Sequence, residues 1–203
     1  RPVLPQVLKD KIPLKADAGS LPTTIHKRKM LLLDGCVQPG MAPNINSATA
    51  RVLDKLDIEL VRADKAGCCG AISHHLNAQD EALGYVKRNI DAWWPHIKAG
   101  AEAIVVTASG CGTAMQEYGH LLQHDAAYAN KATRVSALFR DVSQVISSEQ
   151  NRLQELLKKS IKSNSYKIAF HAPCSLQHGL KLKNIVEPLL SAAGFTLTNV
   201  PDA

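Results

Sequence analysis

The sequence has few aromatic residues and no long apolar run, and both absences restrict what the chain can be. Aromatic residues make up 4% of its 203 residues and hydrophobic residues 45%, so we expect a packed but mainly aliphatic core. No run reaches the roughly 18 apolar residues that a membrane-spanning helix needs. The N-terminus lacks a signal-peptide layout and a starting Met, so we expect a trimmed chain or a fragment.

The sequence also lacks the cysteine spacings of common zinc modules and of disulfide frameworks. It contains no Cys-x2-Cys pair, its cysteine count is odd, and no export signal precedes them. The five cysteines are Cys36, Cys68, Cys69, Cys111 and Cys174. We therefore expect a reducing cytoplasm, in which clustered cysteines act as metal ligands, redox thiols or nucleophiles.

Positive charge exceeds negative charge, with a formal net charge of +6. No basic run is interleaved with aromatic residues and no nucleic-acid motif occurs, so we predict no nucleic-acid partner. The lysines are typical of a solvated surface, and the alternative is a docking face for an acidic partner or an anionic membrane surface.

Short apolar runs alternate with amphipathic segments along the chain. Predicted strands lie at 30–33, 58–61, 103–107, 168–170 and 195–200, and predicted helices lie at 46–56, 79–96, 113–124, 132–158 and 183–193. Asn46 or Ser47 is expected to cap the first helix. This alternation predicts an α/β fold, with a parallel sheet flanked by helices.

Every cysteine follows the end of a predicted strand. Cys36 follows the first strand, Cys68 and Cys69 the second, Cys111 the third and Cys174 the fourth. Ligands of open α/β sheets bind at this carboxyl edge. The placement therefore predicts that the first four cysteines converge on one site.

The first four cysteines form a Cys-x31-Cys-Cys-x41-Cys pattern. Thiolates are soft ligands that suit zinc or the iron of an iron–sulfur cluster. Adjacent cysteines bind one tetrahedral zinc with difficulty, whereas they can serve two irons of a cluster. A redox-active thiol pair and buried structural thiols remain the alternatives from pattern alone.

An approximate internal repeat suggests how the chain is divided. A shift of 138 positions superposes Cys174 on Cys36 and Asp202 on Asp64. We predict an extended leader at 1–29, a complete cysteine-rich domain at 30–160 and a truncated second copy at 166–203. Cys174 would open the second site and would not serve the first.

Four segments carry a resemblance to a known family. They are LLLDGCVQPG at 31–40, AGCCGAISHH at 66–75, VVTASGCGTAMQEYG at 105–119 and HAPCSLQHG at 171–179. These segments resemble the cysteine-rich CCG domain. Their amino-acid sequences are most similar to those of iron–sulfur subunits of bacterial glycolate oxidases.

The resemblance implies an electron-transfer role. It implies an iron–sulfur cluster, [4Fe-4S] or non-cubane, or else zinc, with Cys36, Cys68, Cys69 and Cys111 as ligands. Flavin-binding subunits would oxidise glycolate, and electrons would pass to a membrane acceptor. The chain itself would not be catalytic, and it would be cytoplasmic, or peripheral at the inner face of the membrane. The alternative is a zinc-stabilised interaction module without a redox role.

The sequence departs from the family pattern at Ala108, where the pattern Cys-x-x-Cys has its first cysteine. The site therefore has four cysteines rather than five. An ordinary cluster, a four-cysteine site, zinc, or a site helped by a histidine are the alternatives to a five-thiolate non-cubane cluster.

Overall fold

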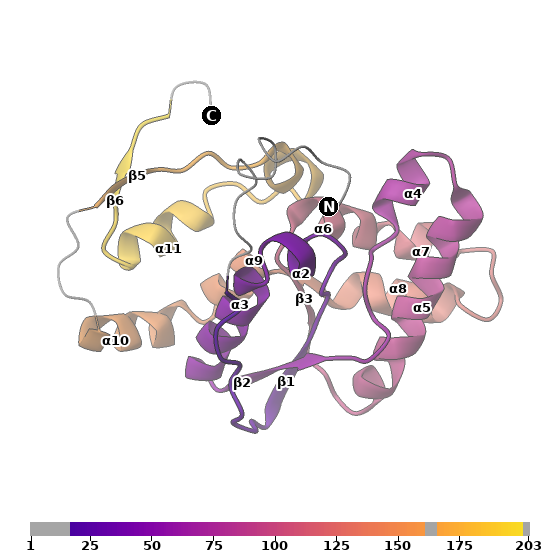
Figure 1. The fold of residues 1–203 in the computed structure, drawn as a ribbon, viewed down its shortest axis with the longest axis horizontal. Helices are drawn as coiled ribbons and strands as arrows, with labels where there is room; N and C mark the ends of the chain where they lie inside the picture. The colour runs from indigo at the N-terminus through magenta and orange to yellow at the C-terminus, as the bar shows by residue number, and fades with distance from the viewer. Residues whose placement is uncertain (1–16, 161–165, 201–203) are drawn as a thin grey trace, which may run out of the picture.

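The computed structural model describes residues 17–160 and 166–200 of the chain. Its main sheet has four parallel strands in the order β2-β1-β3-β4, as Figure 1 shows. The strands are β1 (Arg28–Leu32), β2 (Ile58–Arg62), β3 (Ile104–Val106) and β4 (Phe139–Asp141). Helices flank this sheet, which confirms the predicted α/β fold class.

The order of the strands reverses beside β1. The chain leaves β1 through α2 (Gln38–Met41) and α3 (Asn44–Lys55) and enters β2 on one side of it. It then returns through α4 (Ala71–His75) and α5 (Gln79–Lys98) to β3, on the other side of β1. A reversal of this kind opens a crevice between the first strand and its new neighbour, where α/β proteins bind ligands.

Alternating residues of the strands supply two hydrophobic cores, one on each face of the sheet. Leu31 and Ile104 contribute to one core, and Met30 and Val105 to the other. The alternation follows from the two-residue period of a strand. Both faces of the sheet are therefore covered, as parallel sheets require.

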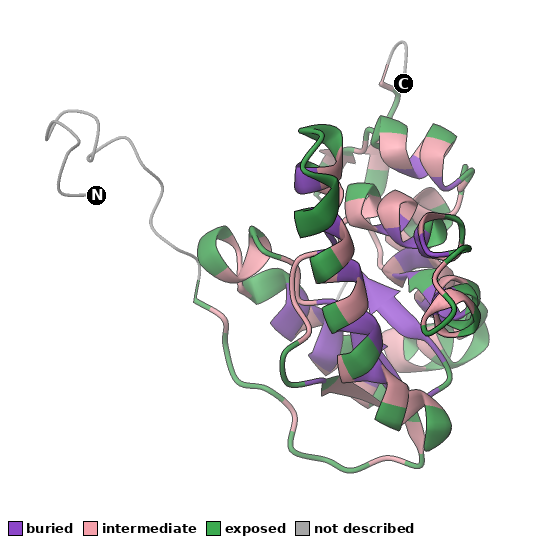
Figure 2. Cartoon of the chain, turned by 90° about the vertical axis from the view of Figure 1, so that its right-hand side faces the viewer, coloured by how far each residue is buried: buried purple, intermediate pink, exposed green. Residues whose placement is uncertain are grey.

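Helices from different parts of the chain cover the two faces. The larger core includes residues of α5, α6 (Ser109–Gln116), α7 (Tyr118–Leu121) and α8 (Ala129–Leu138). The smaller core includes residues of α3, α9 (Val142–Ser148) and α10 (Gln150–Ser160). Figure 2 shows the buried residues gathered on the strands and on the inner sides of the helices. No helix in the described part of the chain is long and apolar enough to cross a membrane.

A second, two-stranded parallel sheet lies to one side of the first (Figure 1). It consists of β5 (Lys167–Ala169) and β6 (Thr196–Thr198), joined through a π-helical turn η1 (Ser175–Gly179) and α11 (Val186–Ala192). Turn η1 packs on α6, and its Leu176 is buried in the larger core together with Leu180. The division into a complete domain and a truncated copy stays a prediction, and the two parts share this contact.

Two local predictions were wrong. A strand, β4, interrupts the helix predicted at 132–158, because buried Phe139 and Asp141 alternate with exposed Arg140 beside β3. Asp141 then caps α9, with Gln144 completing a capping box. The predicted caps Asn46 and Ser47 lie inside α3, which begins two residues before Asn46.

Some predictions fall outside the described residues. They concern most of the extended leader, at 1–16, the connection at 161–165 and the repeat partner Asp202. The described end of the leader, from Asp17 to His26, contains no helix or strand. It is tied to α3 through the ring of His26, whose Nε2 lies 2.9 Å from Asp54 Oδ1.

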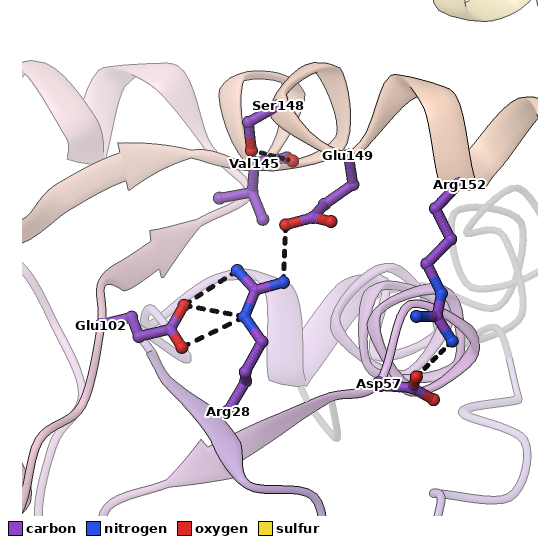
Figure 3. A network of polar contacts seen from close by, with 7 residues as sticks. All are labelled: Arg28, Asp57, Glu102, Val145, Ser148, Glu149 and Arg152. Atoms are coloured by element: carbon purple, nitrogen blue, oxygen red, sulfur yellow. Dashed lines mark hydrogen bonds and ion pairs between the residues drawn. The ribbon is translucent and has the colours of Figure 1, made fainter.

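Ion pairs tie together the amino edge of the main sheet (Figure 3). Arg28, at the start of β1, donates from Nη2 to Glu102 Oε2 (2.9 Å) and from Nη1 to Glu149 Oε1 (2.7 Å). Arg152 of α10 pairs with Asp57, just before β2. These contacts link the strand starts to the junction of α9 and α10, on the side of the sheet opposite to the cysteines.

Candidate cysteine site

The first four cysteines follow the first three strands, as predicted. Cys36 lies in the loop between β1 and α2, and Cys68 and Cys69 lie between β2 and α4. Cys111 lies in the first turn of α6, directly after β3. Because the strands are parallel, all four cysteines lie at the carboxyl edge, where the strand order reverses.

The four thiols belong to one interacting group. The side chain of Cys68 interacts with that of Cys36, and the side chain of Cys69 interacts with those of Cys111 and Cys68. The charges of Cys36 and Cys68 also act on Cys111. Cysteines that are up to 75 positions apart in the sequence thus meet at one place.

The pair of Cys69 and Cys111 shares its proton unequally. The hydrogen bond from Cys111 lowers the pKa of Cys69 to about 6, against the opposing effect of burial, and the backbone amide of Ala71 lowers it further. The same bond to Cys69, together with burial, raises the pKa of Cys111. The contact with Cys111 therefore favours the thiolate form of Cys69, which is the form that binds metal.

Cys68 has a less favourable environment for its charged form. Burial is the main cause that raises its pKa, while the Gly70 amide, 3.5 Å from its sulfur, lowers it. Backbone N–H groups of Gly70 and Ala71 thus face the two adjacent sulfurs. Such donors stabilise negative charge on cluster-bound sulfur.

The donor set consists of four soft thiols, the kind of ligand that suits iron–sulfur clusters and zinc. In residues 17–160 and 166–200, no group of three or more His, Cys, Asp or Glu side chains is arranged to hold one metal ion. In an iron–sulfur cluster each thiolate binds its own iron, so the ligands of a cluster need not converge on one point.

The turn that carries the adjacent cysteines depends on Gly70. Its φ is +87°, a left-handed conformation that glycine adopts without strain. A Cβ at this position would lie 2.9 Å from the carbonyl oxygen of Ala82 in α5. The turn therefore approaches α5 more closely than a residue with a side chain would allow.

Two buried residues that the sequence did not single out for a role hold the same turn. Asn89 of α5 donates from Nδ2 to the carbonyl of Cys68 (2.7 Å) and accepts from the Gly67 amide (2.9 Å). Tyr118 of α7 donates to the carbonyl of Cys69 (2.8 Å) and accepts from Asn89 (3.3 Å). No short motif marks these residues, because their partners lie 21 to 49 positions away.

The loop of Cys36 is held by a second polar network. Asn46 of α3 donates to the carbonyl oxygen of Asp34 (3.1 Å). The hydroxyl of Thr107, at the end of β3, donates to Asn46 Oδ1 (2.7 Å), and Gln38 Oε1 lies 2.9 Å from that hydroxyl. Asn46 therefore joins the ends of β1 and β3 instead of capping α3.

The remaining candidates lie near this group without joining its thiol contacts. Cys174 is exposed and immediately precedes η1, and the next residue, Ser175, lies 2.6 Å (Oγ to Oγ) from Ser109 of α6. Ala108 is the residue before α6 and has extended backbone. His74 lies on α4 along a cavity of about 150 Å³ that also contacts Cys69.

Comparison with known proteins extends this description. Residues 30–116 match the family described as a cysteine-rich domain, CCG. The chain is 50% identical to the "Glycolate oxidase iron-sulfur subunit" of Escherichia coli (strain K12), over 100% of this chain and 49% of that protein. It is 25% identical to the "Probable glycolate oxidase iron-sulfur subunit" of Bacillus subtilis (strain 168), over 94% of this chain and 42% of that protein.

A third relative has a different name. The chain is 26% identical to "Lactate utilization protein A" of Bacillus pumilus (strain SAFR-032), over 86% of this chain and 70% of that protein. The chain spans about half the length of the two glycolate oxidase relatives. The resemblance predicted from the sequence is confirmed: residues 30–116 match the cysteine-rich CCG domain, and the chain is similar along its whole length to an iron–sulfur subunit of glycolate oxidase.

Proposed function

We propose that this chain is the cysteine-rich part of an electron-transfer subunit and that Cys36, Cys68, Cys69 and Cys111 bind one iron–sulfur cluster. The observation that carries the proposal is the meeting of four thiols at the carboxyl edge of the sheet, where the strand order reverses. The similarity to a protein named as an iron–sulfur subunit of glycolate oxidase supports it.

The residues of the chain have distinct tasks in this proposal. When bound, the cluster supplies a centre that accepts and releases one electron at a time. Cys36, Cys68, Cys69 and Cys111 would hold the cluster as thiolates, and the contact with Cys111 favours the charged form of Cys69. The amides of Gly70 and Ala71 donate to the sulfurs and stabilise the charge that remains on them.

The partners follow from the same similarity. We propose that flavin-binding subunits oxidise glycolate to glyoxylate and that electrons pass through this chain to an acceptor at the inner face of the membrane. The names of the two glycolate oxidase relatives support an iron–sulfur assignment, and none of the three names includes zinc. Zinc is therefore an outcome of the tests and not a second proposal.

Electron transfer in the complete complex tests the proposal. We expect Cys68→Ser, in the full-length subunit, to abolish glycolate-driven reduction of an artificial dye acceptor, because serine replaces a ligand sulfur. Glycolate should still reduce the flavin of the partner subunit, which stopped-flow absorbance measures. Dye reduction at the wild-type rate would contradict the role of Cys68.

Cys174→Ser is the matched control, since it makes the same atomic change at a cysteine outside the group of four thiols. We expect this variant to keep the electron paramagnetic resonance signal of the first site. If both variants lose that signal equally, the separation of Cys174 from the first site is wrong.

A further inference from the structure

Asn89 and Tyr118 form a closed polar chain beneath the adjacent cysteines. Both side chains are fully buried, with 0% exposure. The chain runs from the Gly67 amide to Asn89, and from Asn89 to the carbonyl of Cys68 and to Tyr118. Tyr118 then donates to the carbonyl of Cys69. Every polar atom of the two side chains is thus used.

These bonds go to the backbone of the cysteine turn and not to the sulfurs. The direction of each Cys side chain depends on the orientation of its peptide groups, because the backbone sets the Cα–Cβ direction. The carbonyl of Cys68 is fixed by a residue of α5, and that of Cys69 by a residue of α7. Residues of two helices therefore hold the backbone from which both sulfurs project.

We propose that Asn89 and Tyr118 are positioning residues, which fix the Cys68–Cys69 turn in its ligating geometry before the cofactor binds. The inference rests on the proposed function, since it requires that these cysteines hold a cluster. Buried hydrogen bonds to the residues that present ligands orient them and slow the loss of metal. Gly70, which lets the turn approach α5 closely, completes the arrangement.

A purely structural role makes a different prediction. If the two residues only satisfy each other in the core, their loss destabilises the fold but leaves cofactor retention in the folded protein unchanged. If they position the cysteines, the folded variant releases its iron faster. The rate of iron release from folded protein therefore separates the two roles.

The test compares two tyrosine variants of the full-length subunit, purified anaerobically. Tyr118→Phe removes only the hydroxyl that holds Cys69. Tyr128→Phe is the matched control, because its hydroxyl also bonds to a residue of α5, Asp91 Oδ2 at 2.6 Å, but on the surface. Iron release to excess bathophenanthroline disulfonate is followed by absorbance, and circular dichroism verifies the fold.

We expect Tyr118→Phe to release iron faster than the wild type, by roughly the ten- to hundredfold range in which outer-shell substitutions weaken metal binding. Tyr128→Phe should match the wild type. The same rate in Tyr118→Phe and Tyr128→Phe would overturn the proposal. Asn89→Asp, which keeps the size but cannot donate to the Cys68 carbonyl, should accelerate release in the same range.

Hydrogen exchange in the metal-free wild type provides a test that needs no variant. The Gly67 amide should be protected, since it donates to buried Asn89, and exchange as fast as that of an unprotected peptide amide would overturn preorganisation. This result is independent of the proposed function. If the wild type binds no iron, or Cys68→Ser keeps it, the cluster assignment fails even when Gly67 is protected.

Discussion

The two edges of the main sheet are held together by different chemistry. At the amino edge, Arg28 and Glu102 form an ion pair in which both side chains are exposed, by 40% and 38%. At the carboxyl edge, buried amide and hydroxyl groups of Asn89 and Tyr118 bind the backbone of the cysteine turn. The Arg28–Glu102 pair consists of exposed charges, and the network at the cysteine turn consists of buried neutral groups. The carboxyl edge also has an exposed ion pair, Arg62 with Asp34, away from that turn.

The difference indicates where the fold tolerates change. An exposed ion pair contributes about 1 kcal/mol or less, because water and salt screen it. A buried donor or acceptor that loses its partner costs roughly 1–3 kcal/mol, because water cannot replace that partner. The amino edge is therefore replaceable, whereas the carboxyl edge fixes the geometry that the cysteines need.

The largest effect is expected for Gly70→Ala, at the carboxyl edge. The added Cβ would lie 2.9 Å from the Ala82 carbonyl oxygen, and the turn would hold alanine in a left-handed conformation. We therefore expect about 1–3 kcal/mol of destabilisation and a loss of bound iron. Urea unfolding and iron analysis measure the two effects. Gly84→Ala, in the middle of α5 with open space around it, is the control and should be neutral or slightly stabilising.

A smaller effect is expected for Thr107→Val, at the same edge. The change keeps the shape of the side chain but leaves Asn46 Oδ1 without the donor that now lies 2.7 Å away, so about 1–2 kcal/mol should be lost. Thr133→Val is the control, since Thr133 donates to a backbone carbonyl on the exposed side of α8. Equal losses of unfolding free energy in the two variants would contradict the claim that the Thr107 bond stabilises the fold more than the exposed Thr133 bond does.

The smallest effect is expected at the amino edge, for Glu102→Gln. We expect a loss of about 1 kcal/mol or less, and even less in high salt. Iron content should not change. A double-mutant cycle with Arg28→Gln measures the pair itself, and a coupling well above 1 kcal/mol would mean that the two edges do not differ as described.

The sequence allowed the location of the cysteines to be predicted, but not their pairing. Cys36 and Cys111 each follow an apolar run that forms a strand, so their common edge follows from the parallel fold. Which sulfur meets which depends on loop paths and on the turn at Gly70. Periodicity carries no information about such paths.

The supporting residues could not be predicted for a related reason. Asn46 matched the local sequence pattern of a helix cap. In the structure it lies inside α3, and its side chain bonds to Thr107, which is distant in the sequence. Asn89 lies in an amphipathic helix, where a polar residue is ordinarily expected to face solvent, yet it is fully buried. Strand β4 was missed because its three residues are too few to show a two-residue period within a helical pattern.

The most direct test of the central claim is anaerobic analysis of iron, acid-labile sulfide and zinc in the full-length subunit and in its Cys69→Ser variant. The account predicts that the variant loses iron and sulfide in equal amounts relative to the wild type, because serine replaces a ligand sulfur that contacts both Cys68 and Cys111. Loss of zinc without any loss of sulfide, or identical metal content in the two proteins, would contradict it.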